Sequence, residues 1–511
     1  MFRSFLCFSI FFVTVKKGNI LILFEHKHMR EDIIEKRKEK IEILTEAKMN
    51  PYPEKTQRGY ALNFIHKSFD TLMESGEDFS LVGRIRSMRV MGKIVFAHIE
   101  DQDEKIQIFL NKKDLGETFD LFVKTVDLGD IVEISGKAFL TKKDERTILV
   151  SSWKMLSKAL RPIPSEHFGI KNTEELLRKR YLDLMIYKET RDIFVKKNIF
   201  WQTIRTFLAK QSFLEVQTPV LESVPGGADA EPFITHHNAM NRNFYMRISL
   251  ELALKRLLVG GYEKVFEIGR VFRNEGISRE HLQEFDHMEF YWAYADLEGG
   301  MLFSEELFRK IAKNVLGGYQ HSFEGEMIDW EKPFPRIDYF EAFKSEMGID
   351  LSDDVSEKEL KDKADDLGIS YEKSYGKGRM IDTLYKKTVR RKLIQPCFLI
   401  GHPLEVSPLA KTDPENPKKV LRMQIVAGRS ELCNAFSELN DPLEQRRRFE
   451  EQMKLRELGD KEAQMIDEDF LEALEYGMPP AFGFGMSERF FAFLMNRSIR
   501  ETVPFPLVRE Q

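Results

Sequence analysis

One short stretch of the chain gathers side chains that are suited to binding charged small molecules. Residues 266–291 place charged or titratable groups close to aromatic ones: Arg273, Glu275, Arg279, His281, Glu284 and Glu289. A guanidinium binds phosphate or carboxylate oxygens in a planar fork, and a carboxylate binds an ammonium group. The stretch therefore predicts a floor for an anionic nucleotide and a cationic substrate. The other interpretation is a solvated hairpin with surface ion pairs.

The same stretch has the pattern of a β-hairpin. Apolar and polar residues alternate from Val265 to Phe272, which is typical of a half-buried strand. Phe285 to Tyr291 again mixes aromatic and polar residues, and the segment between them contains Asn274 and Gly276, which favour loops. We therefore expect two strands joined by a charged loop.

Composition sets the broad class of the protein. The chain has 511 residues, enough for two or three domains, with 42% hydrophobic and 32% charged residues, as in globular proteins. The net charge of −5 does not favour a bulk polyanion binder, so contact with nucleic acid must come from local patches. The three cysteines, Cys7, Cys397 and Cys433, lie far apart and form no disulfide or zinc pattern. This usage fits a reducing cytoplasm.

The first 28 residues differ from the rest. The apolar run from Phe5 to Val15 is shorter than a membrane span, and Lys16 and Lys17 follow it without a signal cleavage site. We expect residues 1–28 to be a non-native extension, with the true start at Met29 and no membrane association. A membrane anchor is the alternative.

Residues 29–77 are predicted to form a charged helix, from Met29 to about Lys48, and a connector. Two prolines after the helix, Pro51 and Pro53, end it. Its basic residues are either solvated or in contact with RNA phosphates: Lys36, Arg37, Lys38 and Lys40.

Residues 78–157 contain five short segments with strand character and turn signals, which predict a small β-barrel of the OB type. Such barrels stack unpaired bases on aromatic side chains beside basic ones. Arg89, Phe96 and Gln107 supply a guanidinium, an aromatic platform and an amide. Taken alone, Phe96 fits a barrel core better than a stacking site.

The remainder is predicted as a linker at 158–186, a large unit at 187–511, and within it a helical insertion at about 302–400. A helix from Thr190 to Lys210 precedes a strand that a proline breaks, and a second helix runs from Leu250 to Tyr262. No phosphate-binding loop of the G-x-x-x-x-G-K-[ST] type occurs. Gly483 and Gly485 precede a helix, but no βαβ unit surrounds them. An ATP site in this chain must therefore use arginines.

Three motifs, which occur in a fixed order, carry a close resemblance to a known enzyme family. The resemblance covers nearly the whole chain from Met29 onward. The motifs are SFLEVQTPVL with Pro219, RVFRNEGISREHLQEF with Arg273 and Glu275, and GFGMSERFFAFL with Arg489, and between them lie PGGADAEPFITHHNA, HPLEVSPLAK and NAFSELNDP. The sequence resembles class II lysyl-tRNA synthetases, of subclass IIb. The resemblance implies an α+β fold: an OB-fold barrel, then a class II catalytic domain with a mostly antiparallel sheet flanked by helices.

The resemblance also implies a reaction. L-lysine and ATP form lysyl-adenylate with release of pyrophosphate, and the adenylate then acylates tRNA(Lys) with release of AMP. The implied enzyme is a cytoplasmic homodimer that uses Mg²⁺. In-line attack of a carboxylate on a phosphate requires positioning and charge neutralisation, which suits arginine-rich residue types.

For ATP, the resemblance assigns Arg273, Glu275 and Arg489 as the catalytic residues. Arg273 binds the α-phosphate and the lysine carboxylate, and His281 and Arg489 hold the outer phosphates. Phe285 stacks on adenine, and Glu275 accepts a hydrogen bond from its amino group.

For lysine, the resemblance assigns Glu251 and the Gly227 backbone to the α-ammonium. The residues assigned to the rest of the substrate are Glu289, Tyr291 and Glu438 at the side-chain ammonium, Asn434 at the carboxylate, and Phe436 in the same pocket. Glu431 and Gln424 match the magnesium positions, and Arg89, Phe96 and Gln107 match the anticodon-reading positions. A pocket with three glutamates suits a cationic side chain.

Several residues depart from the usual lysyl pattern. Leu282 and Gln283 replace an asparagine and a proline, and Gln424 stands where a second acidic metal ligand is usual. The third motif is one residue shorter before Arg489, and Glu488 replaces an aspartate. Ser212 stands where a glycine is common.

Three alternatives stay open. An aspartyl or asparaginyl ligase would need cationic or amide groups in the pocket instead of three glutamates. A paralogue that lysylates a protein would lack the barrel. A catalytically silent RNA-binding protein on this fold would not need Arg273, Glu275 and Arg489.

Overall fold

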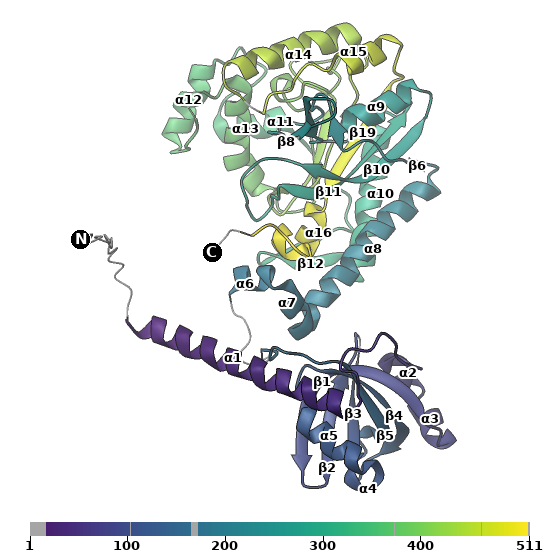
Figure 1. Ribbon diagram of the computed structural model, residues 1–511. Coiled ribbons are helices and arrows are strands. Elements are labelled where there is room, and N and C mark those ends of the chain that lie inside the picture. Colours follow the sequence, from purple (N-terminus) through teal and green to yellow (C-terminus); the bar gives the residue numbers. More distant parts are fainter. Residues whose placement is uncertain (1–16, 103, 165–171, 373, 461, 509–511) are drawn as a thin grey trace, which may run out of the picture. The chain divides into compact units, whose positions relative to one another are not determined.

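The computed structural model (Figure 1) describes residues 17–102, 104–164, 172–372, 374–460 and 462–508, with side chains from Glu31 onward. The chain divides into two compact units, Met1–Gly169 and Ile170–Gln511. The apolar run Phe5–Val15 lies outside the described residues. Helix α1 (Lys17–Glu46) passes through Met29 without a break, so the expected helix start at Met29 is wrong.

The first unit is built on the predicted barrel. Strands β1 (Phe79–Met91), β2 (Ile94–Glu100), β3 (Lys105–Asn111), β4 (Ile131–Leu140) and β5 (Arg146–Ser157) close in the order β1-β2-β3-β5-β4. Alternate residues of β2, such as Val95 and Ala97, are buried inside the barrel, so their neighbours face outward. Short helices α2 (Leu62–Lys67), α3 (Phe69–Ser75), α4 (Lys112–Leu115) and α5 (Glu117–Thr125) accompany the barrel. The OB prediction is confirmed.

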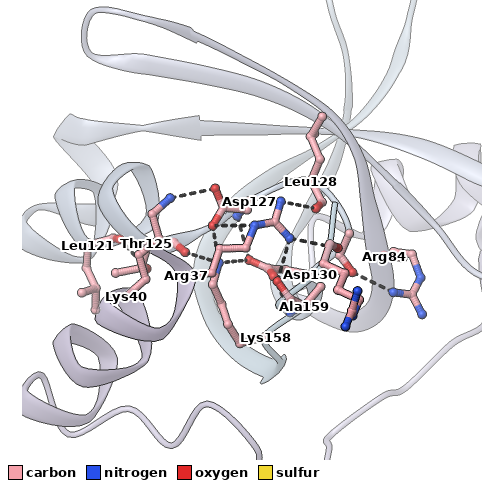
Figure 2. A network of polar contacts seen from close by, with 12 residues as sticks. Arg37, Lys40, Arg84, Leu121, Thr125, Asp127, Leu128, Asp130, Lys158 and Ala159 are labelled. Carbon is pink, nitrogen blue, oxygen red and sulfur yellow. Dashed lines mark hydrogen bonds and ion pairs between the residues drawn. The ribbon is translucent and has the colours of Figure 1, made fainter. Parts of the chain in front are cut away.

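A buried ion network ties α1 to the barrel (Figure 2). Lys158, whose side chain is fully buried, pairs with Asp127 at 2.5 Å and Asp130 at 2.7 Å. From α1, Lys40 binds Asp127 at 2.7 Å, and Arg37 donates to the carbonyl oxygen of Ala159 at 2.6 Å. These two basic residues are therefore engaged within the protein, and contact of the basic helix face with RNA phosphates stays a prediction.

The second unit is organised on one large sheet. Its main path follows the order β14-β15-β16-β18-β19-β11-β10-β6, and β17 (Ser430–Glu431) pairs with β16. The strands are β6 (Leu214–Glu215), β10 (Lys264–Phe272), β11 (Glu284–Ala293), β14 (Arg336–Asp338), β15 (Cys397–Ile400), β16 (Arg422–Ala427), β18 (Asn434–Ser437) and β19 (Ala481–Ser487). The pairs β14–β15 and β10–β6 are parallel, and the others are antiparallel. The predicted hairpin and the mostly antiparallel sheet are both confirmed.

Each face of this sheet has its own apolar core. On one face, Phe290 and Phe484 pack among aromatic residues of α8 (Lys188–Lys210), α10 (Leu297–Leu316) and α16 (Arg489–Leu494). On the other face, Tyr291 and Phe436 pack with α9 (Glu251–Val259), α14 (Pro442–Glu457) and α15 (Glu468–Glu475). Adjacent residues of a strand point to opposite faces of the sheet. Strand β11 therefore contributes Phe290 to the first core and Tyr291 to the second.

The predicted insertion at 302–400 has different limits in the structure. Helix α10 begins at Leu297 and belongs to the main core, and β14 and β15 are strands of the main sheet. Only α11 (Tyr339–Met347), α12 (Glu357–Asp366) and α13 (Lys377–Lys387) form a helical group with a core of its own. A hairpin of β12 (Gln320–Phe323) and β13 (Glu326–Asp329) also lies in this range. Strand pairing across large sequence gaps explains the difference, because local patterns do not reveal it.

Other segments complete the second unit. The predicted linker contains helices α6 (Thr173–Arg178) and α7 (Arg180–Ile186), and β7 (Leu221–Glu222), β8 (Ile234–His237) and β9 (Arg242–Met246) form a small sheet. Ser212 has φ of 65°, a conformation that favours glycine. In the part of the chain that the structure describes, no helix is both long and apolar enough to cross a membrane.

Candidate functional site

Strand register brings the predicted binding residues into rows. Glu289 of β11 pairs with Gly485 of β19, which pairs with Asn434 of β18. One rung further, Tyr291 pairs with Gly483, which pairs with Phe436. Directly paired residues and residues two apart share a face of a sheet, so these side chains line one surface. The structure thus unites residues that lie about 150 positions apart in sequence.

The glycines of β19 make the room for this surface. A Cβ on Gly483 would overlap Glu438 Oε1 and lie 2.6 Å from Tyr291 Cε1. A Cβ on Gly485 would lie 3.0 Å from His287 Nε2. Sequence reasoning missed this role and used the two glycines only to exclude a dinucleotide motif. Their alternation with phenylalanines along one strand is the signal that could have revealed a strand with one bare face.

Glu289 is buried and held by three donors. Ser249 Oγ and the Leu250 amide donate to Oε1 at 2.6 and 2.9 Å, and the Tyr291 hydroxyl donates to Oε2 at 2.9 Å. Burial, and then the nearby carboxylate of Glu251, raise the pKa of Glu289 to about 7. His287 lies 3.5 Å away, but burial lowers its pKa to about 3, so it is neutral at pH 7.

Glu251 and Glu438 come together on a residue that the sequence analysis did not single out. Lys255, one turn after Glu251 on α9, binds Glu251 Oε1 at 2.6 Å and also contacts Glu438 Oε2. All three side chains are buried, and Glu438 Oε1 has no hydrogen-bond partner. Gly227 lies against this group with φ of 83°, and a Cβ there would be 2.9 Å from Glu251 Cβ. The predicted pair of Glu251 and Gly227 is thus adjacent.

Arg273 lies at the end of β10 beside the aromatic residue predicted to stack on adenine. Its guanidinium carbon is 5.3 Å from the centre of the Phe285 ring, and Nε donates to the carbonyl oxygen of Ile248 at 3.3 Å. Burial lowers the pKa of Arg273, and the carboxylate of Glu275 partly offsets this effect, which places Glu275 nearby. Asn434 Oδ1 accepts a hydrogen bond from Arg422 at 2.7 Å, which leaves the Asn434 amide hydrogens available as donors.

The two unusual loop residues have structural roles. Leu282 is buried within the apolar cluster of Phe285 and Val271. Gln283 Nε2 donates to the carbonyl oxygen of Glu275 at 3.0 Å, which holds the loop around that residue. The departures from the usual pattern therefore support the loop.

A cationic group surrounds Glu431. Burial would raise the pKa of Glu431, but Lys386, Arg390 and Arg489 outweigh burial and lower it to about 2. Arg390 pairs with its carboxylate at 3.1 Å. His281 differs, because burial and the charge of Arg489 lower its pKa to about 4, so it is neutral at pH 7. Neither Lys386 nor Arg390 was identified from the sequence, because both lie in the range expected to be an insertion.

The residues predicted to hold magnesium lie on paired strands. Gln424 Nε2 contacts Glu431 Oε2 at 3.4 Å, and the Gln424 Oε1 atom is buried without a hydrogen-bond partner. Such an orphaned oxygen beside a carboxylate fits a hard cation that prefers oxygen ligands. Among the described residues, no group of three or more His, Cys, Asp and Glu side chains could hold a metal ion. Further ligands would have to come from a bound phosphate or water.

Glu488 lies outside the pocket. It forms an ion pair with Lys197 of α8 and accepts a hydrogen bond from the Asp286 amide at 3.1 Å. This replacement for the usual aspartate therefore fixes the start of α16, and Arg489 with it, against β11 and α8.

Of the predicted nucleic-acid residues, Arg89 and Phe96 lie on the outer face of the barrel, whereas Gln107 is buried. Arg89 of β1 pairs in register with Phe96 of β2, which pairs with Phe109 of β3. The Phe96 and Phe109 rings are 4.8 Å apart, and Phe96 is half-buried between inward-facing neighbours. Gln107 Oε1 accepts a hydrogen bond from Thr147 at 2.9 Å. Phe109 was missed in the sequence, although it has the same phase along β3 as Gln107.

The binding surface of the second unit thus has two ends of opposite charge. One end presents three carboxylates around aromatic rings, and the other presents arginines, a lysine and a neutral histidine. Such an arrangement can hold a cationic small molecule against a polyphosphate, with Arg273 beside both.

Comparison with known proteins agrees with this geometry. The family described as tRNA synthetases class II (D, K and N) matches residues 172–509, and the OB-fold nucleic acid binding domain matches residues 79–156. A lysine–tRNA ligase of Halalkalibacterium halodurans is 42% identical over 487 residues, which cover 94% of this chain and 97% of that protein. Lysine–tRNA ligases of Moorella thermoacetica and Bacillus subtilis are 42% and 40% identical, covering 94% and 95% of this chain and 98% and 99% of their own lengths.

Proposed function

The chain belongs to the class II aminoacyl-tRNA synthetases, among the lysine–tRNA ligases, and from this premise we propose how its residues ligate L-lysine to tRNA(Lys). Lysine and ATP react to give lysyl-adenylate and pyrophosphate. The adenylate then transfers lysine to the terminal ribose of tRNA(Lys), and AMP is released.

The lysine substrate is held by opposite charges at both ends. Glu251 and the Gly227 backbone bind the α-ammonium, while Glu289, Tyr291 and Glu438 bind the side-chain ammonium. The Asn434 amide and Arg273 bind the carboxylate, and Phe436 covers the aliphatic chain. Support comes from the shared face of Glu289, Tyr291, Asn434 and Phe436. It also comes from the unpartnered Glu438 Oε1, which faces Gly483 and Tyr291.

ATP lies against the other end. Phe285 stacks on the adenine ring, and Glu275 accepts a hydrogen bond from the adenine amino group. Arg273 binds the α-phosphate as the lysine carboxylate attacks that phosphate. A charge developing at that phosphate is stabilised by the nearby guanidinium in a partly desolvated site. Arg489 binds the outer phosphates by charge, whereas neutral His281 binds them by hydrogen bonds.

Glu431 and Gln424 are the residues that would hold Mg²⁺. The ion supplies positive charge to the phosphates of ATP and orients them. Glu431 is well suited to this role, because its pKa of about 2 keeps it ionised at all physiological pH values.

The barrel binds the anticodon of tRNA(Lys). Phe96 stacks on an unpaired base, with Arg89 and Gln107 beside it. Two observations support this role: the outward phase of Phe96 and the aromatic partner Phe109 at its side.

The enzyme acts as a cytoplasmic homodimer. Exposed apolar side chains on α8 and on strands β6, β7 and β8 fit a symmetric interface. They are Val195, Ile199, Leu214, Leu221 and Ile234, with exposed fractions of 56%, 37%, 46%, 48% and 62%. Sedimentation equilibrium tests this arrangement, and a monomer at micromolar concentration would exclude it.

The observation that carries the amino acid specificity is the pocket of three buried glutamates, Glu251, Glu289 and Glu438. Amino-acid-dependent ATP–pyrophosphate exchange tests it with lysine, aspartate and asparagine. We expect exchange with lysine alone. Exchange with aspartate or asparagine but not lysine would overturn the specificity, and no exchange with any of the three would favour a silent RNA-binding protein.

A further inference from the structure

Lys255 places a permanent internal cation inside the lysine pocket. Its side chain is fully buried, and its ammonium contacts Glu251 Oε1 at 2.6 Å and Glu438 Oε2. The ammonium also lies 5.5 Å from the centre of the Phe436 ring and 5.8 Å from that of Phe470. Burial lowers the pKa of Lys255, but the two glutamates outweigh burial and raise it, so the amine stays charged.

The charged side chains of the pocket together leave a net negative charge. Glu251, Glu289 and Glu438 are buried, and Lys255 is the cation that contacts two of them. His287 beside Glu289 adds no charge at pH 7. Burial raises the pKa of each of these glutamates, so the count applies when ammonium groups are bound and all three are ionised. In that state three carboxylates and one ammonium leave two negative charges, and an unpaired buried carboxylate is strongly destabilising. L-lysine brings two ammonium groups.

We propose that Lys255 is a specificity-determining positioning residue: it neutralises one of the three pocket glutamates and thereby sets at two the number of ammonium groups that the amino acid site accepts. This proposal rests on the lysine-ligating function stated above. Lys255 itself does not touch the reacting atoms.

The geometry gives Lys255 a second effect on Glu438. The contact with Oε2 leaves the other oxygen of Glu438 without a partner, over Gly483 and next to the Tyr291 ring. That free oxygen is the one available to the substrate ammonium. Lys255 therefore orients the carboxylate as well as balancing its charge.

If Lys255 were only part of an ion pair that stabilises the core, the variants would behave differently from what the proposed charge balance predicts. With Glu438→Gln alone, the pocket keeps one net negative charge, and the Lys255 ammonium repels the substrate ammonium. With Glu438→Gln and Lys255→Met together, two negative charges remain, as in the wild type. If Lys255 only stabilised the fold, the second substitution would add a further loss.

The test compares these variants in lysine-dependent ATP–pyrophosphate exchange. We expect Glu438→Gln and Lys255→Met each to raise the KM for lysine at least about tenfold, with the KM for ATP changed less than about threefold. The double variant should recover kcat/KM for lysine at least about fivefold over Glu438→Gln. A double variant as poor as Glu438→Gln, or poorer, would overturn the proposal.

Matched controls separate charge from folding. Lys255→Arg combined with Glu438→Gln keeps the cation and should show no recovery. Lys158→Met removes another fully buried lysine that bridges two carboxylates, Asp127 and Asp130, and should leave the KM for lysine unchanged. If Lys255→Met does not fold, Lys255→Gln with Glu438→Gln makes the same comparison with two amides that can hydrogen-bond. Absence of lysine-dependent exchange in the wild type would instead refute the proposed function.

Discussion

The carboxylate of Glu438 occupies the space beside Gly483 where any other residue would place its Cβ. The backbone of Glu438 is fixed by a hydrogen bond from its amide to the carbonyl oxygen of Ala481 at 2.8 Å. Its side chain is buried and its carboxylate contacts Lys255, so the carboxylate has little freedom to move away from an added methyl group. The absence of a side chain at Gly483 is thus a condition for the end of the pocket that we propose binds the side-chain ammonium.

Gly483→Ala should displace Glu438 and crowd Tyr291. We expect the KM for lysine to rise about tenfold to a hundredfold, because one charge-assisted bond of about 1.5–3 kcal/mol is lost, while the KM for ATP stays nearly constant. Pyrophosphate exchange measures both constants. Gly318→Ala is the control, since a Cβ there meets no atom within 4 Å. Equal effects of the two changes would contradict this role of Gly483.

Lysine binding should weaken as the pH falls through 7. Burial and Glu251 raise the pKa of Glu289 to about 7, and only its ionised form binds an ammonium. Below that pH, kcat/KM for lysine should fall by up to about tenfold per pH unit. Exchange rates between pH 6 and pH 8 measure the change at fixed saturating ATP.

The raised pKa of Glu289 has the opposite effect on the stability of the fold, which decreases as the pH rises. A carboxyl group whose folded-state pKa exceeds the unfolded value stabilises the fold at low pH, and this stabilisation is lost as the pH rises through 7. Bound lysine compensates the ionised form. The increase in Tm caused by a fixed lysine concentration should therefore be larger at pH 8 than at pH 6, and a shift that is independent of pH would refute the assignment.

Gln424→Glu should strengthen the binding of Mg²⁺ beside Glu431. A second carboxylate beside Glu431 adds charge to a site where the Gln424 amide nitrogen contacts Glu431 and the amide oxygen has no hydrogen-bond partner. We expect the Mg²⁺ concentration for half-maximal exchange to fall several-fold. Gln424→Leu should raise it, and identical Mg²⁺ requirements in all three proteins would exclude Gln424 as a ligand.

Ser212→Gly should stabilise the second unit. The left-handed conformation at φ of 65° costs a residue with a Cβ about 1–2 kcal/mol, and the entropy of glycine offsets part of the gain. We expect a net stabilisation of about 0.5–1 kcal/mol in urea unfolding. Ser75→Gly, at the end of the right-handed helix α3, should destabilise instead.

Phe96→Leu should separate tRNA charging from amino acid activation. Loss of one base stack costs about 1–3 kcal/mol, so the KM for tRNA(Lys) should rise at least about fivefold while pyrophosphate exchange is unchanged. Phe64→Leu is the control, because Phe64 is an exposed aromatic residue on α2, outside the sheet. A normal KM for tRNA in the Phe96 variant would return Phe96 to a packing role.

Much of the fold was predictable because its signals are local. Alternating apolar residues predicted the β10–β11 hairpin, and five short strands with turns predicted the barrel. Motif order predicted the catalytic domain, and the family resemblance predicts that Arg273, Glu251 and Glu438 bind the substrates. The insertion was misplaced because β14 and β15 join the sheet through pairing with distant strands, which no local pattern records.

The sequence by itself determined which chemical groups are present: three glutamates suited to ammonium groups, arginines suited to phosphates and an aromatic residue suited to stacking on a base. Only the tertiary structure decided how these groups balance one another. Lys255 is four residues from Glu251, but its contact with Glu438 crosses 183 positions and depends on packing α9 against β18 and β19. Charge compensation falls steeply with distance and depends on burial, and both are set by the assembled fold.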